Sequence, residues 1–132
     1  MDFHNGYFVK KCEKIESLSV LKLQVCNLIR EEFNIECDDD EKVLNQFHEF
    51  VNEVSAIDLN EKRMLLIKKI NQNINFKELI FNSFKDTILD LLGPDLLVQK
   101  NCNIVIQMPN DNNPSELHRD APSNSSYEIV LW

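Results

Sequence analysis

The sequence predicts an α+β fold in a single domain that spans residues 1–132. Two observations support this fold class: apolar residues recur at helical spacing through residues 1–97, and a period-two alternation replaces that spacing within residues 98–132. A hydrophobic content of 43% in 132 residues is sufficient for one core. The chain is too short for two domains of ordinary size.

Four apolar stripes predict four helices joined by short polar links, after a short strand near Gly6–Val9. The stripes are Leu18, Leu21, Val25, Leu28 and Ile29; Val43, Leu44, Phe47, Val51 and Val54; Leu66, Ile67, Ile70 and Ile74; and Phe76, Leu79, Ile80, Ile88 and Leu91. The carboxylates of Asp38–Asp40 are expected to end the first helix and to cap the second, rather than to bind a cation. Ser55 or Asp58 is expected to cap the third helix, and Gly93-Pro94 to end the fourth.

Residues 98–132 predict β-structure. The segment Cys102–Met108 alternates so that Cys102, Ile104, Ile106 and Met108 share one face, and the polar stretch from Pro109 to Pro114 predicts a loop. A second strand is expected at Tyr127–Trp132. Two strands do not make a self-sufficient sheet, and the second ends on Ile-Val-Leu-Trp, which leaves an apolar edge without a partner. We therefore expect the β-structure to be incomplete and to continue in residues beyond Trp132.

Composition excludes several classes of function. The net charge of −8 argues against nucleic acid as the main partner, because phosphate binding needs clustered Lys and Arg. Two glycines are too few for a phosphate-binding loop. No apolar run approaches the ~20 residues of a membrane span. Four scattered cysteines without a CxxC pair predict reduced thiols, and the N-terminus has no signal-peptide pattern, so we expect a cytoplasmic protein.

The segment between the two predicted strands contains Glu116-Leu117-His118-Arg119-Asp120. In an extended backbone, residues i and i+2 point to the same side, so His118 and Asp120 would direct an imidazole nitrogen and a carboxylate toward one point. This is part of the two-histidine, one-carboxylate triad of non-haem iron(II) oxygenases. The tripeptide alone favours a surface loop that contains an Arg-Asp pair over a metal site.

The order of the predicted segments gives further evidence besides the His-x-Asp motif. A helical half is followed by a strand that ends in Gln107-Met108-Pro109, a polar loop, His-x-Asp and a β-rich strand. This organisation resembles the phytanoyl-CoA dioxygenase-like iron(II)/2-oxoglutarate oxygenases. It is most similar to a bacterial subgroup associated with sporadically distributed carbohydrate-biosynthesis clusters. The segments that carry the resemblance are Phe3–Tyr7, Asn103–Asp111, Leu117–Asp120 and Tyr127–Trp132.

The resemblance implies a fold, cofactors and site residues. The β-part would form the first strands of a double-stranded β-helix (jelly-roll). His118 and Asp120 would be the first two ligands of Fe(II), and Gln107 would face the cavity that binds the cofactor 2-oxoglutarate. The substrate would be a small metabolite, a sugar or a sugar-linked compound in this subgroup.

The sequence departs from that family at two positions of the site. Such enzymes carry a distal histidine ligand and a following Arg that binds the far carboxylate of 2-oxoglutarate, but no histidine follows His118 here. His48 falls on a predicted helix, and Arg119 would point away from the metal. We therefore expect the chain to be the N-terminal part of an oxygenase, with weak iron binding and no turnover by itself.

Two other interpretations remain open on the sequence alone. The chain could be a small helical interaction module that recruits a partner strand near Trp132, or an inactive truncated remnant without a complete metal site. Metal-dependent hydrolysis would need further ligands and a general base that the sequence does not supply.

Overall fold

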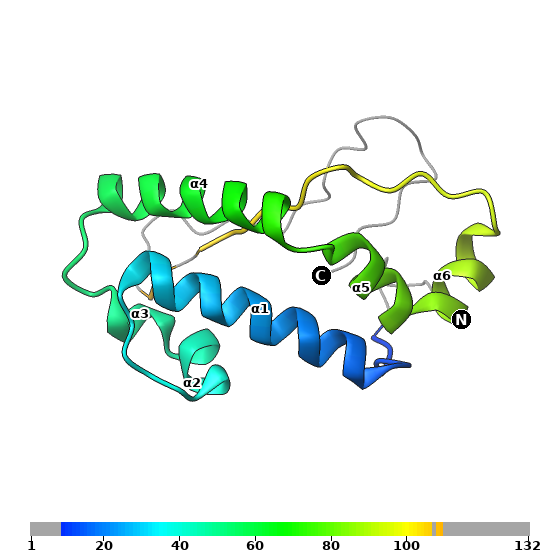
Figure 1. Ribbon diagram of the computed structural model, residues 1–132, viewed down its shortest axis with the longest axis horizontal. Coiled ribbons are helices and arrows are strands. Elements are labelled where there is room, and N and C mark those ends of the chain that lie inside the picture. Colours follow the sequence, from blue (N-terminus) through cyan, green and yellow to red (C-terminus); the bar gives the residue numbers. More distant parts are fainter. Residues whose placement is uncertain (1–8, 107, 110–132) are drawn as a thin grey trace.

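The computed structural model describes residues 9–106 and 108–109 (Figure 1). The regular elements of this part of the chain are all α-helices. They are α1 (Ile15–Phe33), α2 (Asp40–Asn45), α3 (Phe47–Phe50), α4 (Ala56–Asn73), α5 (Phe76–Ser83) and α6 (Lys85–Leu92).

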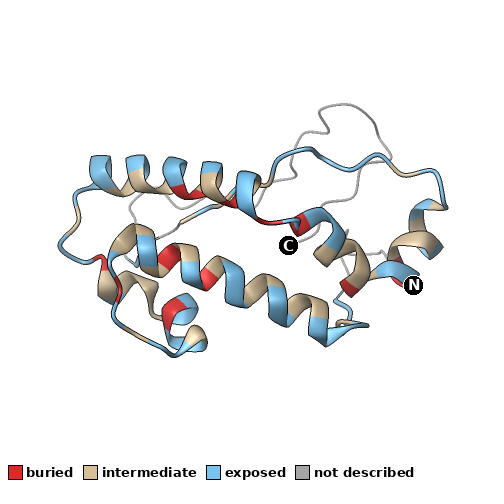
Figure 2. Cartoon of the chain, viewed as in Figure 1, coloured by how far each residue is buried: buried red, intermediate tan, exposed pale blue. Residues whose placement is uncertain are grey.

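The two long helices, α1 and α4, lie side by side and run in opposite directions (Figure 1). Part of the core lies on their facing sides, and Figure 2 shows buried turns on both helices. The core cluster consists of Cys26, Ile29, Ile35, Val43, Leu66, Ile70, Ile74 and Phe76. The apolar stripes at helical spacing therefore identified the packing faces of the main helices, because burial of a continuous stripe is what stabilises a helix of this kind.

Local side-chain chemistry sets several of the helix ends. Helix α1 ends at Phe33, because Asn34 takes the left-handed conformation with φ 53°. The expectation that the Asp38–Asp40 run ends this helix is thus wrong. Asp39 does cap α2, accepting hydrogen bonds from the N–H groups of Glu41 and Lys42 at 2.9 and 3.2 Å.

The caps expected around α4 and after α6 are confirmed. The Ser55 hydroxyl accepts the Asp58 N–H at 3.1 Å and donates to the Asp58 carboxylate at 2.7 Å. Gly93 follows α6 with φ 79°, a backbone conformation that favours glycine.

Two of the predicted helices are each divided into two. The second is broken at Gln46, between α2 and α3, and the fourth at Phe84, between α5 and α6. A carboxylate stabilises the second break: Glu13 accepts the N–H groups of Asp86 and Thr87 at 2.8 and 2.9 Å, and also the Thr87 hydroxyl. The N–H groups of Glu13 and Lys14 in turn donate to the Ser83 carbonyl. The start of α6 is therefore attached to the segment that precedes α1.

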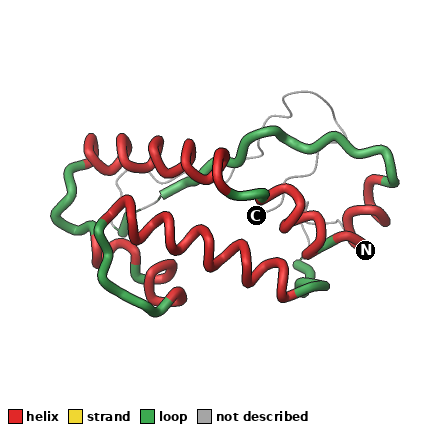
Figure 3. The backbone as a smooth tube through the Cα atoms, viewed as in Figure 1, coloured by secondary structure: helices red, strands yellow, loops and turns green. Residues whose placement is uncertain are grey.

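The predicted α+β fold class is wrong for the part of the chain that the structure describes, in which no strand is present (Figure 3). The segment Cys102–Ile106 runs as a loop beside α4. The Asn71 amide accepts the Cys102 N–H at 2.8 Å and donates to the Cys102 carbonyl at 3.3 Å. Arg63 donates to the Ile104 carbonyl at 2.9 Å. Helix side chains thus take the hydrogen bonds that a neighbouring strand would form in a sheet.

The other predicted strands fall mainly outside the described residues. Of Gly6–Val9 the structure describes Val9 alone, which is not in a strand, and Tyr127–Trp132 lies wholly outside. The alternation in Cys102–Ile106 reflects one-sided burial, because Cys102 and Ile104 pack against the core and Val105 is 70% exposed. The boundary expected near residue 98 is visible only as the change from helices to an extended loop after Gly93.

Candidate functional site

The three residues that the sequence predicts for the iron and 2-oxoglutarate site lie outside the described residues. These are Gln107, His118 and Asp120. The structure does describe the segment that leads to Gln107, and α4 holds this segment through Asn71 and Arg63.

No group of three or more His, Cys, Asp or Glu side chains that could hold a metal ion occurs within residues 9–106 and 108–109. His48 lies on α3 and is half-buried. The aspartate run serves structure: Asp39 caps α2, and Asp40 binds the Arg30 guanidinium at 2.6 Å. Arg30 also donates to the Cys37 carbonyl at 2.6 Å, which fixes the link between α1 and α2.

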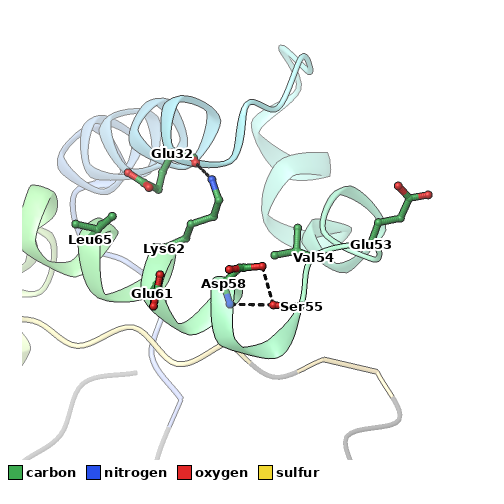
Figure 4. A pocket seen from close by; sticks show the side chains of 8 residues that line it. All are labelled: Glu32, Glu53, Val54, Ser55, Asp58, Glu61, Lys62 and Leu65. Carbon is green, nitrogen blue, oxygen red and sulfur yellow. Dashed lines mark hydrogen bonds between the residues drawn. The ribbon is translucent and has the colours of Figure 1, made fainter.

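A groove of about 500 Å³ lies between the end of α1 and the start of α4 (Figure 4). The residues that line it are Glu32, Glu53, Val54, Ser55, Asp58, Glu61, Lys62 and Leu65. The polar side chains of Ser55 and Asp58 bind each other there, and Figure 4 shows both hydrogen bonds at the first turn of α4. Their function in the structure is to cap the helix.

The basic residues near the groove bind the end of α1. Lys62 donates to the Glu32 carbonyl at 2.6 Å and lies 5.4 Å from the centre of the Phe33 ring. Lys69 pairs with the carboxylates of Glu31 and Glu32, each at 2.9 Å. Cations at the C-terminus of a helix are favourable, because the last carbonyl groups carry partial negative charge. The groove therefore contains inter-helix contacts and the Ser55–Asp58 helix cap, in which the Ser55 hydroxyl donates to the carboxylate.

The buried thiol of the core is not an activated nucleophile. Burial raises the pKa of the Cys26 thiol to about 11, and Asp40 reinforces this shift. Burial also raises the pKa of the Cys102 thiol above its ordinary value. Thiolate catalysis needs a lowered pKa, so neither group fits that chemistry.

Sequence reasoning missed the Asn71 contact, the Glu13 cap and the groove. Each joins residues that are distant along the chain: Asn71 with Cys102, Glu13 with Thr87, and, in the groove, Glu32 with residues 53–65. A helical asparagine at the polar edge of an apolar stripe and a Glu before a helix are common, so no local signal marks them. The Ser55 cap is the part of the groove that the sequence did predict.

No family model, curated protein or solved structure matches the chain. Among the helices of the described residues, none has the length and apolar character needed to cross a membrane.

Proposed function

We propose that the chain is the N-terminal portion of a non-haem iron(II)/2-oxoglutarate-dependent oxygenase that hydroxylates a small metabolite. One observation carries the proposal: His118-x-Asp120 follows Gln107-Met108-Pro109 and a polar loop, and precedes a β-rich segment. This order resembles that of phytanoyl-CoA dioxygenase-like enzymes. The subgroup resemblance suggests a sugar or a sugar-linked compound as the substrate, in the cytoplasm and without a nucleic-acid partner.

The chemistry of the donor set fits the metal. A neutral imidazole and a carboxylate are two of the three ligands that bind Fe(II) on one face and leave positions open for co-substrate. Bound Fe(II) with 2-oxoglutarate supplies the oxidative chemistry of this class. His118 and Asp120 would hold the metal, and Gln107 would contact 2-oxoglutarate from the cavity wall. A complete site also needs a second histidine and a carboxylate-binding Arg, which this sequence does not contain after His118.

The helical part would support this site from outside. Asn71 and Arg63 of α4 bind the backbone of residues 102–104, which precede Gln107 by three positions. This attachment would reduce the conformational freedom of residues 102–104 that ligand binding would otherwise have to overcome.

Iron binding tests the proposal. The complete gene product, with any residues that follow Trp132, would be titrated with Fe(II) under anaerobic conditions. The variants His118→Ala, Asp120→Ala and His48→Ala would be titrated in the same way. We expect a saturable site in the parent protein and in the His48→Ala control, and its loss in the other two variants. A site that persists in His118→Ala, or the absence of any site in the parent, would refute the assignment. The 132-residue chain alone should bind iron weakly, because it offers two of the three donors.

A helical interaction module is the second candidate function. The observation that favours it is a row of exposed apolar residues on α4, which includes Ile57 at 73% and Met64 at 53% exposure. An absence of iron binding, together with a partner that protects α4 from hydrogen exchange, would support this alternative.

A further inference from the structure

Helix α4 has three faces, and two of them are covered. The first packs on α1 through Leu66 and Ile70, which are 1% and 2% exposed. The second binds residues 102–104 through Arg63 and Asn71. At 100° per residue, the remaining side of the helix carries Ile57, Glu61, Met64, Leu65, Lys68 and Gln72, which we call the α4 outer face. Glu61 and Leu65 lie at its edge and also line the groove beside α1.

The α4 outer face is exposed although its centre is apolar. Ile57 is 73%, Met64 53% and Leu65 49% exposed. A shallow hollow at its centre is lined by Asn60, Glu61, Met64, Leu65 and Lys68. Adjacent large apolar side chains with polar residues around them are typical of interaction surfaces.

The charges on this face are arranged symmetrically about its apolar centre. Glu61 lies three positions before Met64, and Lys68 lies three positions after Leu65. None of the ion pairs formed within the described residues includes Glu61 or Lys68. A two-fold axis between Met64 and Leu65 would therefore bring Glu61 of one antiparallel helix beside Lys68 of the other, and would form this pair twice.

We propose that the α4 outer face binds the same face of a second copy of this chain, in an antiparallel two-fold helix pair. The apolar centre, formed by Met64 and Leu65 of both copies, supplies the burial. The two Glu61–Lys68 pairs, one on each side of this centre along the helix axis, fix the direction and the register. The inference is independent of the iron site, because it uses only residues of α4.

The contact is small, and this sets its expected strength. Two single helices in contact bury less than a standard interface, so we expect dissociation constants in the micromolar range or weaker. The net charge of −8 per chain opposes self-association. At physiological salt the Debye length of ~8 Å screens this overall repulsion more than it screens the contacting Glu61–Lys68 pairs.

Charge reversal tests both the face and its register. Sedimentation equilibrium of the full chain at physiological salt, from micromolar to submillimolar concentration, should show a monomer–dimer equilibrium. E61K and K68E should each weaken the dimer about tenfold, because two attractive pairs become repulsive. The double variant E61K/K68E, and an equimolar mixture of the two single variants, should recover the affinity because every pair is again of opposite charge.

A matched pair of apolar variants completes the test. Leu65→Glu should abolish the dimer, whereas Leu23→Glu on α1, at a residue that is 50% exposed, should leave it unchanged. Thermal unfolding followed by circular dichroism confirms that each variant is folded. A chain that stays monomeric, a dimer insensitive to E61K and K68E, or a mixture of those variants that fails to associate would overturn the proposal.

Discussion

The contact between Asn71 and Cys102 gives the sharpest prediction about the fold. In Asn71→Ala, the Cys102 N–H loses its acceptor at 2.8 Å and the Cys102 carbonyl loses its donor at 3.3 Å. Each neutral hydrogen bond contributes about 1 kcal/mol net, so the two together contribute about 2 kcal/mol to holding this segment on α4. The higher helix propensity of alanine stabilises α4 whether or not the segment is bound, so it does not offset this loss. We therefore expect the segment to lose about 1–2 kcal/mol of local stability.

Native-state hydrogen exchange at the Cys102 amide measures this loss directly. A change of about 1–2 kcal/mol corresponds to a roughly 5- to 30-fold fall in protection. Asn71→Asp keeps an acceptor for the Cys102 N–H but loses the donor, so its effect should be intermediate. Asn73→Ala, at an exposed position two residues further along α4, is the matched control and should leave the amide unchanged. Full-rate exchange of the Cys102 amide in the parent chain, or protection that survives Asn71→Ala, would refute the reasoning.

Three further predictions concern the core, a cap and a thiol. Leu66→Ala should lower the free energy of unfolding, measured in urea, by about 3–5 kcal/mol because Leu66 is 1% exposed. Leu23→Ala, at a 50% exposed position, should lower it far less. Similar losses in the two variants would contradict the described packing. The hydrogen bond from Thr87 is the main cause that lowers the pKa of Glu13 from 4.5. The ionised Glu13 carboxylate should stabilise the fold fully above pH 4.5, and this contribution should disappear as the pH falls through the lowered pKa. The difference in urea midpoint between the parent and Glu13→Gln should therefore shrink on acidification. A difference that grows would contradict the sign of this pKa shift. Cys26, whose pKa is raised to about 11, should resist iodoacetamide at mildly alkaline pH until urea unfolds the chain, and rapid labelling of Cys26 in the native state would contradict its burial.

The helical stripes were predictable because burial imposes a period that can be read locally. Leu66 and Ile70 belong to such a stripe and are core residues in the structure. The breaks at Gln46 and Phe84 were not predictable in this way, because the apolar residues continue on both sides of each break. What stabilises the second break is Glu13, which lies about seventy positions earlier in the chain.

The alternating segment shows why period two does not by itself predict a strand. Alternation reports that one side of an extended segment is buried, as Cys102 and Ile104 are against the core. It does not report which groups take the backbone hydrogen bonds. Those of Cys102 are taken by a helix side chain, and this contact depends on a residue about thirty positions away. His118 and Asp120 were proposed from the His-x-Asp motif together with the family resemblance, and they lie outside the described residues, so their role stays a prediction.

Formation of an iron(II)–2-oxoglutarate complex tests the proposed function most directly. The natural-length gene product would be mixed anaerobically with Fe(II) and 2-oxoglutarate, and the visible charge-transfer absorption of the chelate would be recorded for the parent, His118→Ala and His48→Ala. The proposal predicts a saturable band in the parent and in His48→Ala that is absent from His118→Ala. No band in the parent, or an equal band in His118→Ala, would contradict the assignment of His118 and Asp120 to an oxygenase site.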